Sequence, residues 1–468
     1  MKRRKSVLRA NILIELALLI LLPLSVCAQN AQDPVNADVL YLSLDSCIQK
    51  ALRNNAAWKN AELDVLIAEQ TKKEAVTMYF PHIEAGAAAF HSDKPFIEYG
   101  IGDISDAGIR NTLQALYMQY GNALGIPNSI GFLEKGVVAG VTAIQPIYAG
   151  GRIVAGNKLA GLGVDAAKYK QQIARRDIIL KCEELYWQVY ALEQKRNTVE
   201  SATDLLENLH KDVGRAVEAG LVLKNDLLRV ELELNKMRSN KLQLESGRDL
   251  AKSALCQYIG EAEPDSLVLL SGLSGELQNP EMFKIDALAS VSGSYEAELL
   301  DLSVEAEKLK KRMTLGEALP QIGFGGAYAY NNLMEKDYTN LVGFAAVRLP
   351  LSEWWSTAHK LKKHRFEIEK AENTRNDLMQ QLALRTTKIY DDLETSYRQV
   401  MNAESSVANA KENLRLSRDN YNAGLVSLSE MLEAQALYMQ AMDFLTEETI
   451  NYKIKLLHYM QLTRTDSN

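Results

Sequence analysis

Two stretches of this 468-residue chain contain no proline, and their length restricts what the chain can fold into. Residues 147–263 and 351–468 span 117 and 118 positions, and the second stretch holds a single glycine, Gly424. Proline and glycine are the residues that most often interrupt helices. Because an average globular helix has only about 11–12 residues, stretches of this length favour long helices over an ordinary compact enzyme.

The chain contains an internal repeat with an offset of 204 residues. The sequence Ala-Gly-Leu-Val at 219–222 recurs at 423–426, and the same offset relates Pro146 to Pro350. The distance from proline to glycine is therefore 74 residues in both copies. A glycine between two helical stretches permits a turn with positive φ. Each copy is thus expected to form a helical hairpin with its tip at the glycine.

Two strands are expected before each long hairpin. After Pro320, side chains such as Ile322 and Phe324 alternate with small residues, which is the period of a β-strand. With the repeat taken into account, the expected strands cover residues 82–90, 137–145, 321–330 and 341–349. The last long helix carries apolar and small residues spaced alternately by four and three from Ile389 to Tyr421. That spacing is the heptad seam of a coiled coil.

The first copy holds an insertion. Pro81 corresponds to Pro320 at an offset of 239 residues, which is 35 more than the offset of the later prolines. The 35 extra residues lie between Pro81 and Pro146, and insertions persist where the backbone reaches water. We therefore expect segment 91–136 to be a surface loop, with a short helix at 113–118.

The first 28 residues have the pattern of a signal peptide. Four basic residues at 2–5 precede a short apolar run at 16–24, and small residues suit cleavage after Ala28. The alternative is lipidation of Cys27. The expected division of the chain is a signal peptide at 1–28, a first repeat at 29–280 with a linker at about 260–280, and a second repeat at 281–468.

Charge and residue types exclude several classes of function. The formal net charge is −7, so nothing favours nucleic acid as a partner. The six histidines show no ligand spacing with acids or cysteines, and no glycine-rich phosphate loop is present. No catalytic residues, cofactor or metal site are expected, and the chain is not expected to be an enzyme. Cys47, Cys182 and Cys256 are expected to be buried apolar residues and not a disulfide framework.

Four strands per chain indicate a membrane barrel that several chains share. Each expected strand has about eight to ten residues, close to the ~9–11 residues of a tilted outer-membrane strand. Closed membrane barrels have at least ~8 strands, and lipid does not tolerate an open sheet edge. The alternative is a small soluble sheet on a coiled-coil stalk.

These features together resemble the TolC family of outer-membrane efflux channels. The resemblance covers residues 40–463 and depends on the repeat, the proline-flanked strands and two motifs. The motifs are Tyr-Asn-Ala-Gly-Leu-Val at 421–426 and Glu-Met-Leu-Glu-Ala-Gln at 430–435.

The resemblance implies a mainly α fold with a small β part and a homotrimeric assembly. The three chains would share a β-barrel in outer-membrane lipid and an α-helical barrel across the periplasm. The implied function is a passive exit duct for efflux or type I secretion, which a periplasmic adaptor couples to an inner-membrane pump. The alternatives are a periplasmic adaptor and a non-conducting envelope stalk.

By the same resemblance, the two hairpin tips form the periplasmic end of the channel and dock the adaptor. The implied docking residues are Gly220, Leu221, Val222, Gly424, Leu425 and Val426. Exposed Leu and Val at a tip are also, on physical grounds, apolar anchors for a partner.

Acidic residues follow both tips. The resemblance assigns a periplasmic gate to Asp226 and Tyr421, and an acidic throat to Glu430 and Glu433. Three copies of each acid around a narrow pore would attract cations. Val426 stands where the best-known member has a gating arginine, so an arginine lock of that form is not expected. The simpler alternative is that these acids cover solvated helix starts, where they offset the helix dipole.

Aromatic residues flank the ends of the expected strands. Trp354 and Trp355 follow the strand before Pro350, and Tyr148 has a similar place in the first copy. They suit the aromatic belt at a membrane interface, and the alternative is helix packing. If the strands cross the outer membrane, insertion 91–136 lies at its outer face, with the short helix over the pore.

Overall fold

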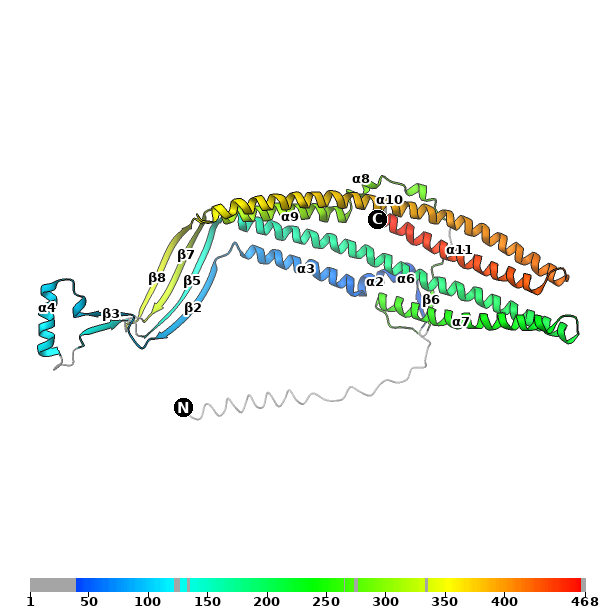
Figure 1. Ribbon diagram of the computed structural model, residues 1–468, viewed down its shortest axis with the longest axis horizontal. Coiled ribbons are helices and arrows are strands. Elements are labelled where there is room, and N and C mark those ends of the chain that lie inside the picture. The colour runs from blue at the N-terminus through cyan, green and yellow to red at the C-terminus, as the bar shows by residue number, and fades with distance from the viewer. Residues whose placement is uncertain are drawn as a thin grey trace, which may run out of the picture.

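The structure is a computed structural model that describes residues 39–121, 127–132, 135–264, 266–272, 277–332 and 336–463. The expected signal peptide and Cys27 lie outside these residues. The molecule is elongated: a bundle of long helices continues into a four-stranded sheet, and a small helical unit projects beyond the far end of the sheet (Figure 1).

The main sheet is antiparallel throughout. Its strands are β2 (His82–His91), β5 (Lys135–Ala149), β7 (Gln321–Asn331) and β8 (Tyr338–Arg348), in the spatial order β2-β5-β7-β8. The register pairs Ala139 with Tyr330. β5 extends on both sides of the expected 137–145, and it passes an irregularity between Pro146 and Tyr148, where proline has no N–H to donate to the ladder.

Each strand of this sheet connects directly to its own helix. The helices are α3 (Ala56–Thr77) before β2, α6 (Arg152–Glu218) after β5, α9 (Tyr295–Glu317) before β7 and α10 (Glu353–Asn422) after β8. α6 and α10 have 67 and 70 residues, which is about 100 Å each at ~1.5 Å per residue. They turn back into α7 (Lys224–Ile259) and α11 (Leu428–Thr463). The expected mainly helical fold with four long strands is confirmed.

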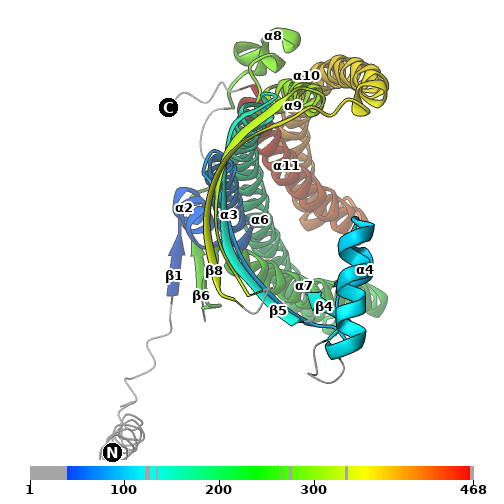
Figure 2. The same cartoon turned by 90° about the vertical axis from the view of Figure 1, so that its left-hand side faces the viewer.

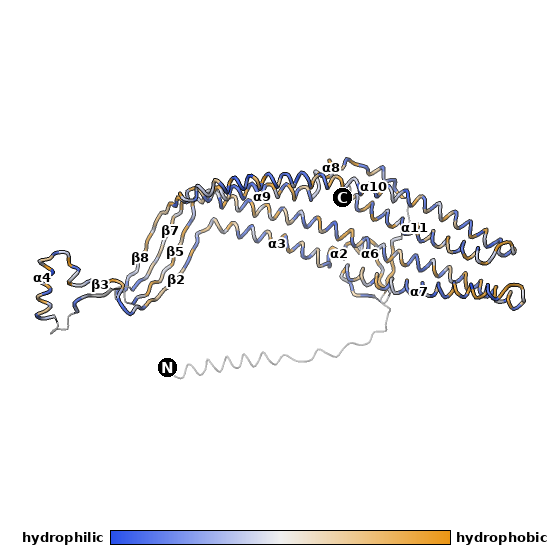
Figure 3. Tube along the Cα trace, in the orientation of Figure 1, coloured by the Kyte–Doolittle hydropathy of each residue, from blue (hydrophilic) through white to orange (hydrophobic). Residues whose placement is uncertain are grey.

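Hydropathy varies along these helices. Hydrophilic residues dominate the parts of α9 and α10 that lie next to the sheet (Figure 3). None of the described helices has the length and the hydrophobicity that crossing a membrane requires.

The heptad seam of α10 is confirmed. Leu393, Ser396, Val400 and Ala403 are buried, and Leu393 and Val400 pack in a cluster with Tyr452 of α11. From there to the end of the helix, the seam positions are half-buried and the residues between them are exposed. The seam therefore faces the partner helix of the hairpin along its whole length.

A second, two-stranded sheet lies part-way along the helices and was not predicted. β1 (Val39–Leu42) pairs in parallel with β6 (Ser266–Leu269), beside α2 (Leu44–Asn54). The Tyr186 hydroxyl joins this sheet to α6, because it accepts the Ser271 N–H at 2.9 Å and donates to the Ser271 carbonyl at 3.0 Å. The expected linker at 260–280 thus contains a strand, and η3 (Pro280–Phe283) and α8 (Ala287–Val291) follow it.

The three cysteines of the described chain are free and buried, as expected. Cys47 and Cys182 pack in one apolar cluster with Tyr186 and Trp187. Burial raises the pKa of both thiols to about 12, so they remain protonated and act as small apolar side chains.

The insertion is a folded unit. β3 (Ile97–Gly100) pairs with β4 (Ser129–Phe132) as an antiparallel stem. Between them come η1 (Ile101–Asp103), α4 (Ala107–Leu116) and the π-helical turn η2 (Tyr117–Gly121). The helix expected at 113–118 begins earlier, because Asp106 caps it by accepting the Ile109 N–H at 2.9 Å.

The two hairpin turns have the same backbone conformation. Gly220 has a φ of 71° and Gly424 a φ of 73°. The next residue in each turn, Leu221 or Leu425, donates its N–H back into the preceding helix at 2.8 Å, which is the Schellman arrangement. A Cβ at either glycine would meet no neighbouring atom, so the need for glycine comes from the positive φ alone.

Replacing Gly220 or Gly424 by alanine is expected to destabilise the corresponding tip by about 1–2 kcal/mol, the cost of a Cβ in the left-handed region. Hydrogen exchange at the tip amides should accelerate accordingly in the detergent-solubilised protein. Gly247→Ala is the control, because Gly247 lies inside α7 and a Cβ there also has open space. Unchanged protection in both tip variants would contradict this account of the turns.

Candidate functional site

The two hairpin tips lie at the end of the molecule opposite the sheet (Figure 1). Leu221 and Leu425 follow the turn glycines at equivalent positions and are 79% and 75% exposed. Val222 and Val426 are half-buried, and Val222 packs against the apolar cluster beneath the tips. The predicted docking residues thus divide into exposed leucines and half-buried valines that support them.

An apolar cluster joins the two hairpins close to their tips. Leu428 and Met431 of α11 pack with Val213 of α6 and with Val230 and Leu234 of α7. These residues come from both repeats, so the second hairpin is held against the first by side-chain packing. The position of one tip is therefore fixed relative to the other.

Tyr421 lies at the edge of this cluster, within the electrostatic reach of Asp226. The tyrosine is half-buried, and burial raises the pKa of its hydroxyl. The carboxylates of Asp226 and Asp212 raise that pKa further. The structure therefore brings the predicted gate pair together, although the two residues are almost 200 positions apart in the chain, and the tyrosine hydroxyl stays protonated and able to donate.

Glu430 and Glu433 lie in the first turns of α11. Ser427 precedes this helix, and its hydroxyl oxygen accepts the Glu430 N–H at 3.3 Å while the hydroxyl lies 3.3 Å from Glu430 Oε1. Both glutamates are exposed. Glu430 thus takes part in capping a helix start, where a negative charge is favourable, and both carboxylates remain accessible.

Arg229 was missed by the sequence analysis. It lies one helical turn after Asp226 on α7, and its guanidinium Nη1 donates to the hydroxyl of Ser429 on α11. This contact links the two hairpins next to Glu430. Arg229 corresponds to Glu433 of the second repeat at the offset of 204 residues. A comparison of charges at equivalent positions could therefore have identified Arg229. Position 426 holds valine and not arginine. Arg229 provides a positive charge at Ser429, three residues further along the chain.

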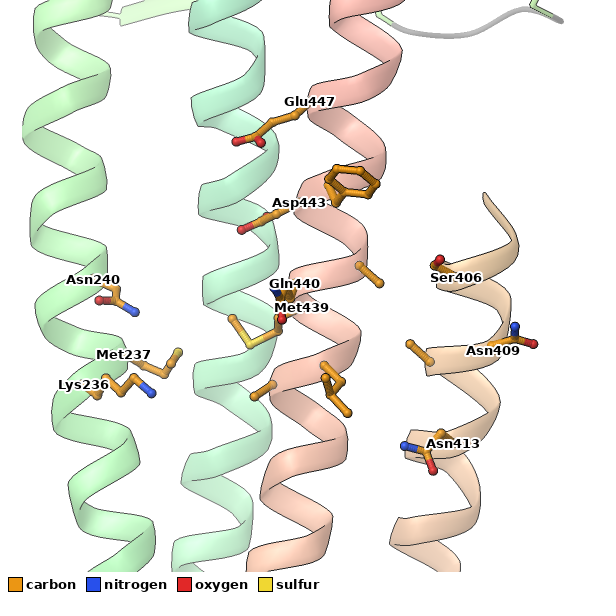
Figure 4. Close-up of a pocket in the computed structure, with 15 residues that line it drawn as sticks. Lys236, Met237, Asn240, Ser406, Asn409, Asn413, Met439, Gln440, Asp443 and Glu447 are labelled. Atoms are coloured by element: carbon orange, nitrogen blue, oxygen red, sulfur yellow. The ribbon is translucent and has the colours of Figure 1, made fainter. Parts of the chain in front are cut away.

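A groove of about 1000 Å³ lies beside the second hairpin, between α7, α10 and α11 (Figure 4). Its polar lining includes Asn240, Asn409, Asn413 and Gln440. Asp443 and Glu447 lie on the side of α11 toward α6, where Lys195 Nζ is 2.5 Å from Glu447. Burial raises the pKa of Asp443, and Lys195 opposes this shift. The groove is open, and Glu447 and Lys236 on its lining are engaged in ion pairs, which does not suit a catalytic centre.

The predicted interface aromatics lie where the sheet meets the helices. Trp354 and Trp355 are exposed in the first turn of α10, and the Trp354 indole N–H donates to the Ala318 carbonyl at 2.8 Å. Tyr148 is exposed just after the irregularity in β5. An indole that is both anchored and exposed suits a boundary between an apolar and a polar medium.

One cluster with the chemistry of metal ligands was not foreseen. Glu307 of α9 and His364 and Glu367 of α10 place ligand atoms within 4.8 Å of one another. Each carboxylate already has a lysine partner, Lys310 at 2.7 Å from Glu307 and Lys363 at 3.5 Å from Glu367. The carboxylates are thus ion-paired within their own helices, and the side chain that joins α9 to α10 here is His364, whose Nε2 lies 2.9 Å from the Thr314 hydroxyl. Residue spacing did not predict this cluster, because strands β7 and β8 separate Glu307 from His364 in the sequence.

Comparisons with known proteins give a family and a fold. Residues 298–462 match the family described as "Outer membrane efflux protein". No curated protein matches the sequence significantly.

Solved channel structures match almost the whole chain. The Campylobacter jejuni CmeC outer membrane channel is 13% identical with a TM-score of 0.70, over 93% of this chain and 90% of that one. The open state of the Neisseria gonorrhoeae MtrE outer membrane channel is 14% identical with a TM-score of 0.67, over 90% and 88%. CusC is 12% identical with a TM-score of 0.72, over 94% and 99%. At these identities the structures establish the fold.

The family match covers the second repeat, and the fold extends the same architecture over both repeats. The predicted resemblance is thereby confirmed, and the alternatives of a periplasmic adaptor and a non-conducting stalk are set aside. The second repeat thus matches the outer membrane efflux protein family, and the chain as a whole has the fold of TolC-type outer-membrane channels.

Proposed function

We propose that three copies of this channel close one barrel and form a passive exit duct, which a periplasmic adaptor couples to an inner-membrane pump for efflux or type I secretion. The observation that carries the proposal is the four-stranded sheet, which has an open edge at β2 and another at β8 within the described chain. Lipid does not tolerate such edges.

The two edges suit each other. Three successive antiparallel pairings make β2 and β8 antiparallel, so β8 of one copy can pair with β2 of the next in the antiparallel sense that runs through the sheet. Four strands are too few for a closed membrane barrel, which needs at least ~8. Three copies of four strands give twelve, and the sheet is already strongly curved (Figure 2).

The helical layer supports the same assembly. α3 and α10 connect to the edge strands β2 and β8, and α3 buries none of its residues within one chain. Leu63, Leu66 and Ile67 of α3 are exposed. An apolar groove of about 720 Å³ between α3 and α6 includes Ile67 and Met78. A neighbouring copy would cover this surface, and the interface aromatics would then meet outer-membrane lipid.

Detergent-extracted protein is expected to be a trimer that resists dissociation, because separation would leave the edges of β2 and β8 without hydrogen-bond partners. Native mass spectrometry should give three times the chain mass. A folded monomer that stays soluble without detergent would rule out the shared barrel.

The tips then converge on the axis at the periplasmic end. Asp226, Glu430 and Glu433 would each occur three times around the narrowest part, with Arg229 and Tyr421 linking the hairpins. Like charges at close range repel one another and attract cations. This arrangement supports a cation-attracting throat that the tip contacts hold shut.

Replacing Glu430 and Glu433 together by Gln is expected to weaken cation selectivity and divalent-cation block in planar bilayers, because six charges leave each trimer while size and polarity are kept. The control is Glu369→Gln with Glu372→Gln, an exposed pair with the same spacing on α10, roughly 75 Å from the tip at ~1.5 Å per residue. If the throat variant and the control behave alike, the acids only cover solvated helix starts.

Leu221 and Leu425 are the proposed anchors for the adaptor, since they are large, apolar and exposed at the end that faces the periplasm. The double change to Asp is expected to abolish transport in cells, while the purified trimer keeps its conductance. Leu242→Asp is the control, because Leu242 is similarly exposed on α7 but lies away from the tip. Full transport by the tip variant would remove these leucines from the docking surface.

A further inference from the structure

We propose that the insertion is an extracellular cap: the α4 helices of three copies pack together on the pore axis and close the outer mouth of the channel. This inference depends on the trimer proposed above. The partner of the α4 surface is therefore a second and a third copy of the same chain.

Hydrogen bonds hold the stem and α4 of the insertion in a defined arrangement. Its stem is the β3–β4 pair, and the Gly100 N–H donates to Asp103 Oδ2 at 2.7 Å where the stem ends. Asp106 caps α4, and Arg110 Nη1 donates to the Ile104 carbonyl at 3.1 Å. These contacts fix the direction in which α4 leaves the stem, so the chain presents the helix in a defined place.

Within the described part of the chain, no other element buries α4. None of its ten residues is buried. Ile109, Leu113, Leu116 and Tyr120 are between 40% and 55% exposed and follow one another at spacings of four, three and four. Residues 107–121 contain one charged residue, Arg110. A helix of ten residues is marginal in water without tertiary packing, and an apolar seam of this spacing is a surface for other helices.

The position of α4 identifies what covers it. α4 lies beyond the end of the sheet that is farthest from the helical hairpins (Figure 1), and on the concave side of the sheet (Figure 2). A barrel closes around the concave side of its strands, and lipid contacts the convex side. Three α4 helices are thus directed toward the barrel axis and toward one another.

The seam also suits a small helical assembly. With Leu113 at heptad position a, Ile109 and Leu116 fall at d. Leu at a with Ile at d favours assemblies larger than dimers. Three such seams around one axis would bury twelve apolar side chains, counting Tyr120, and would leave Asn111 on the outer face of each helix.

Cross-linking tests the contact directly. Leu113→Cys in intact trimers, treated with a short bis-maleimide, is expected to give covalent dimers and trimers at least five-fold more than Asn111→Cys, which is on the opposite face of α4. Cys47, Cys182 and Cys256 are buried and serve as an unmodified background. Intact trimers with no excess for Leu113→Cys would overturn the cap and leave the proposed function in place, whereas the absence of trimers would remove the proposed function itself.

Conductance tests the closure. Leu113→Glu with Leu116→Glu places six negative charges in the seam of a trimer, and the open fraction in planar bilayers is expected to rise several-fold. Asn111→Glu with Gln114→Glu adds the same charge to the outer face and is expected to leave the open fraction unchanged. If the seam variant has the same open fraction as the parent, the helices do not close the pore. The same conclusion follows if Leu113→Cys in vesicles reacts with a lipid-soluble probe and does not cross-link to neighbouring copies.

Discussion

Backbone groups at the edges of β2 and β8 impose the constraint on which the rest of this molecule depends. An unsatisfied N–H or C=O group in lipid costs several kcal/mol, and each edge presents a row of them along at least ten residues. An even number of antiparallel strands leaves edges that run in opposite directions, so identical copies can satisfy each other. Because every strand of the main sheet connects to its own helix, the strand order also fixes the helix order. In the proposed trimer, α3, which buries nothing in one chain, would be the helix that meets the next copy.

The two hairpin tips have the same backbone conformation and differ in charge where the repeats meet. Gly220 and Gly424 have nearly equal φ values, so the turns are equivalent. The positions one turn into the returning helices carry opposite charges, Arg229 in the first copy and Glu433 in the second. Two identical acidic helix starts would repel at the tips, whereas Arg229 reaches the Ser429 hydroxyl across the boundary. Because the first repeat has arginine where the second has glutamate, the contact between the two helix starts is attractive and not repulsive.

The sequence predicted the features that arise from periodicity. Prolines, alternation and the heptad seam located the strands and the long helices, and the seam from Leu393 to Tyr421 faces inward as expected. The parallel β1–β6 pair was not predicted because each strand has only four residues and the two strands are more than 220 positions apart in the chain. The cluster of Glu307, His364 and Glu367 was not predicted because the packing of α9 on α10 brings these residues together, which residue spacing does not show. Tyr421 and Asp226 were paired only through a family resemblance, and the structure adds that Tyr421 packs on the apolar cluster shared by the two hairpins, where the Asp226 carboxylate raises the pKa of its hydroxyl.

The two ends of the proposed duct would close by different physical means. At the periplasmic end, carboxylates, Arg229 and a protonated tyrosine interact through charges and dipoles. Salt screens interactions between exposed charges over a Debye length of about 8–10 Å. At the outer end, the α4 seam is apolar and almost without charge, so ionic strength has little effect on it while amphipathic molecules compete for it. In the proposed duct, an adaptor that separates the tips would therefore not by itself open the outer mouth, because the apolar α4 seam would stay packed.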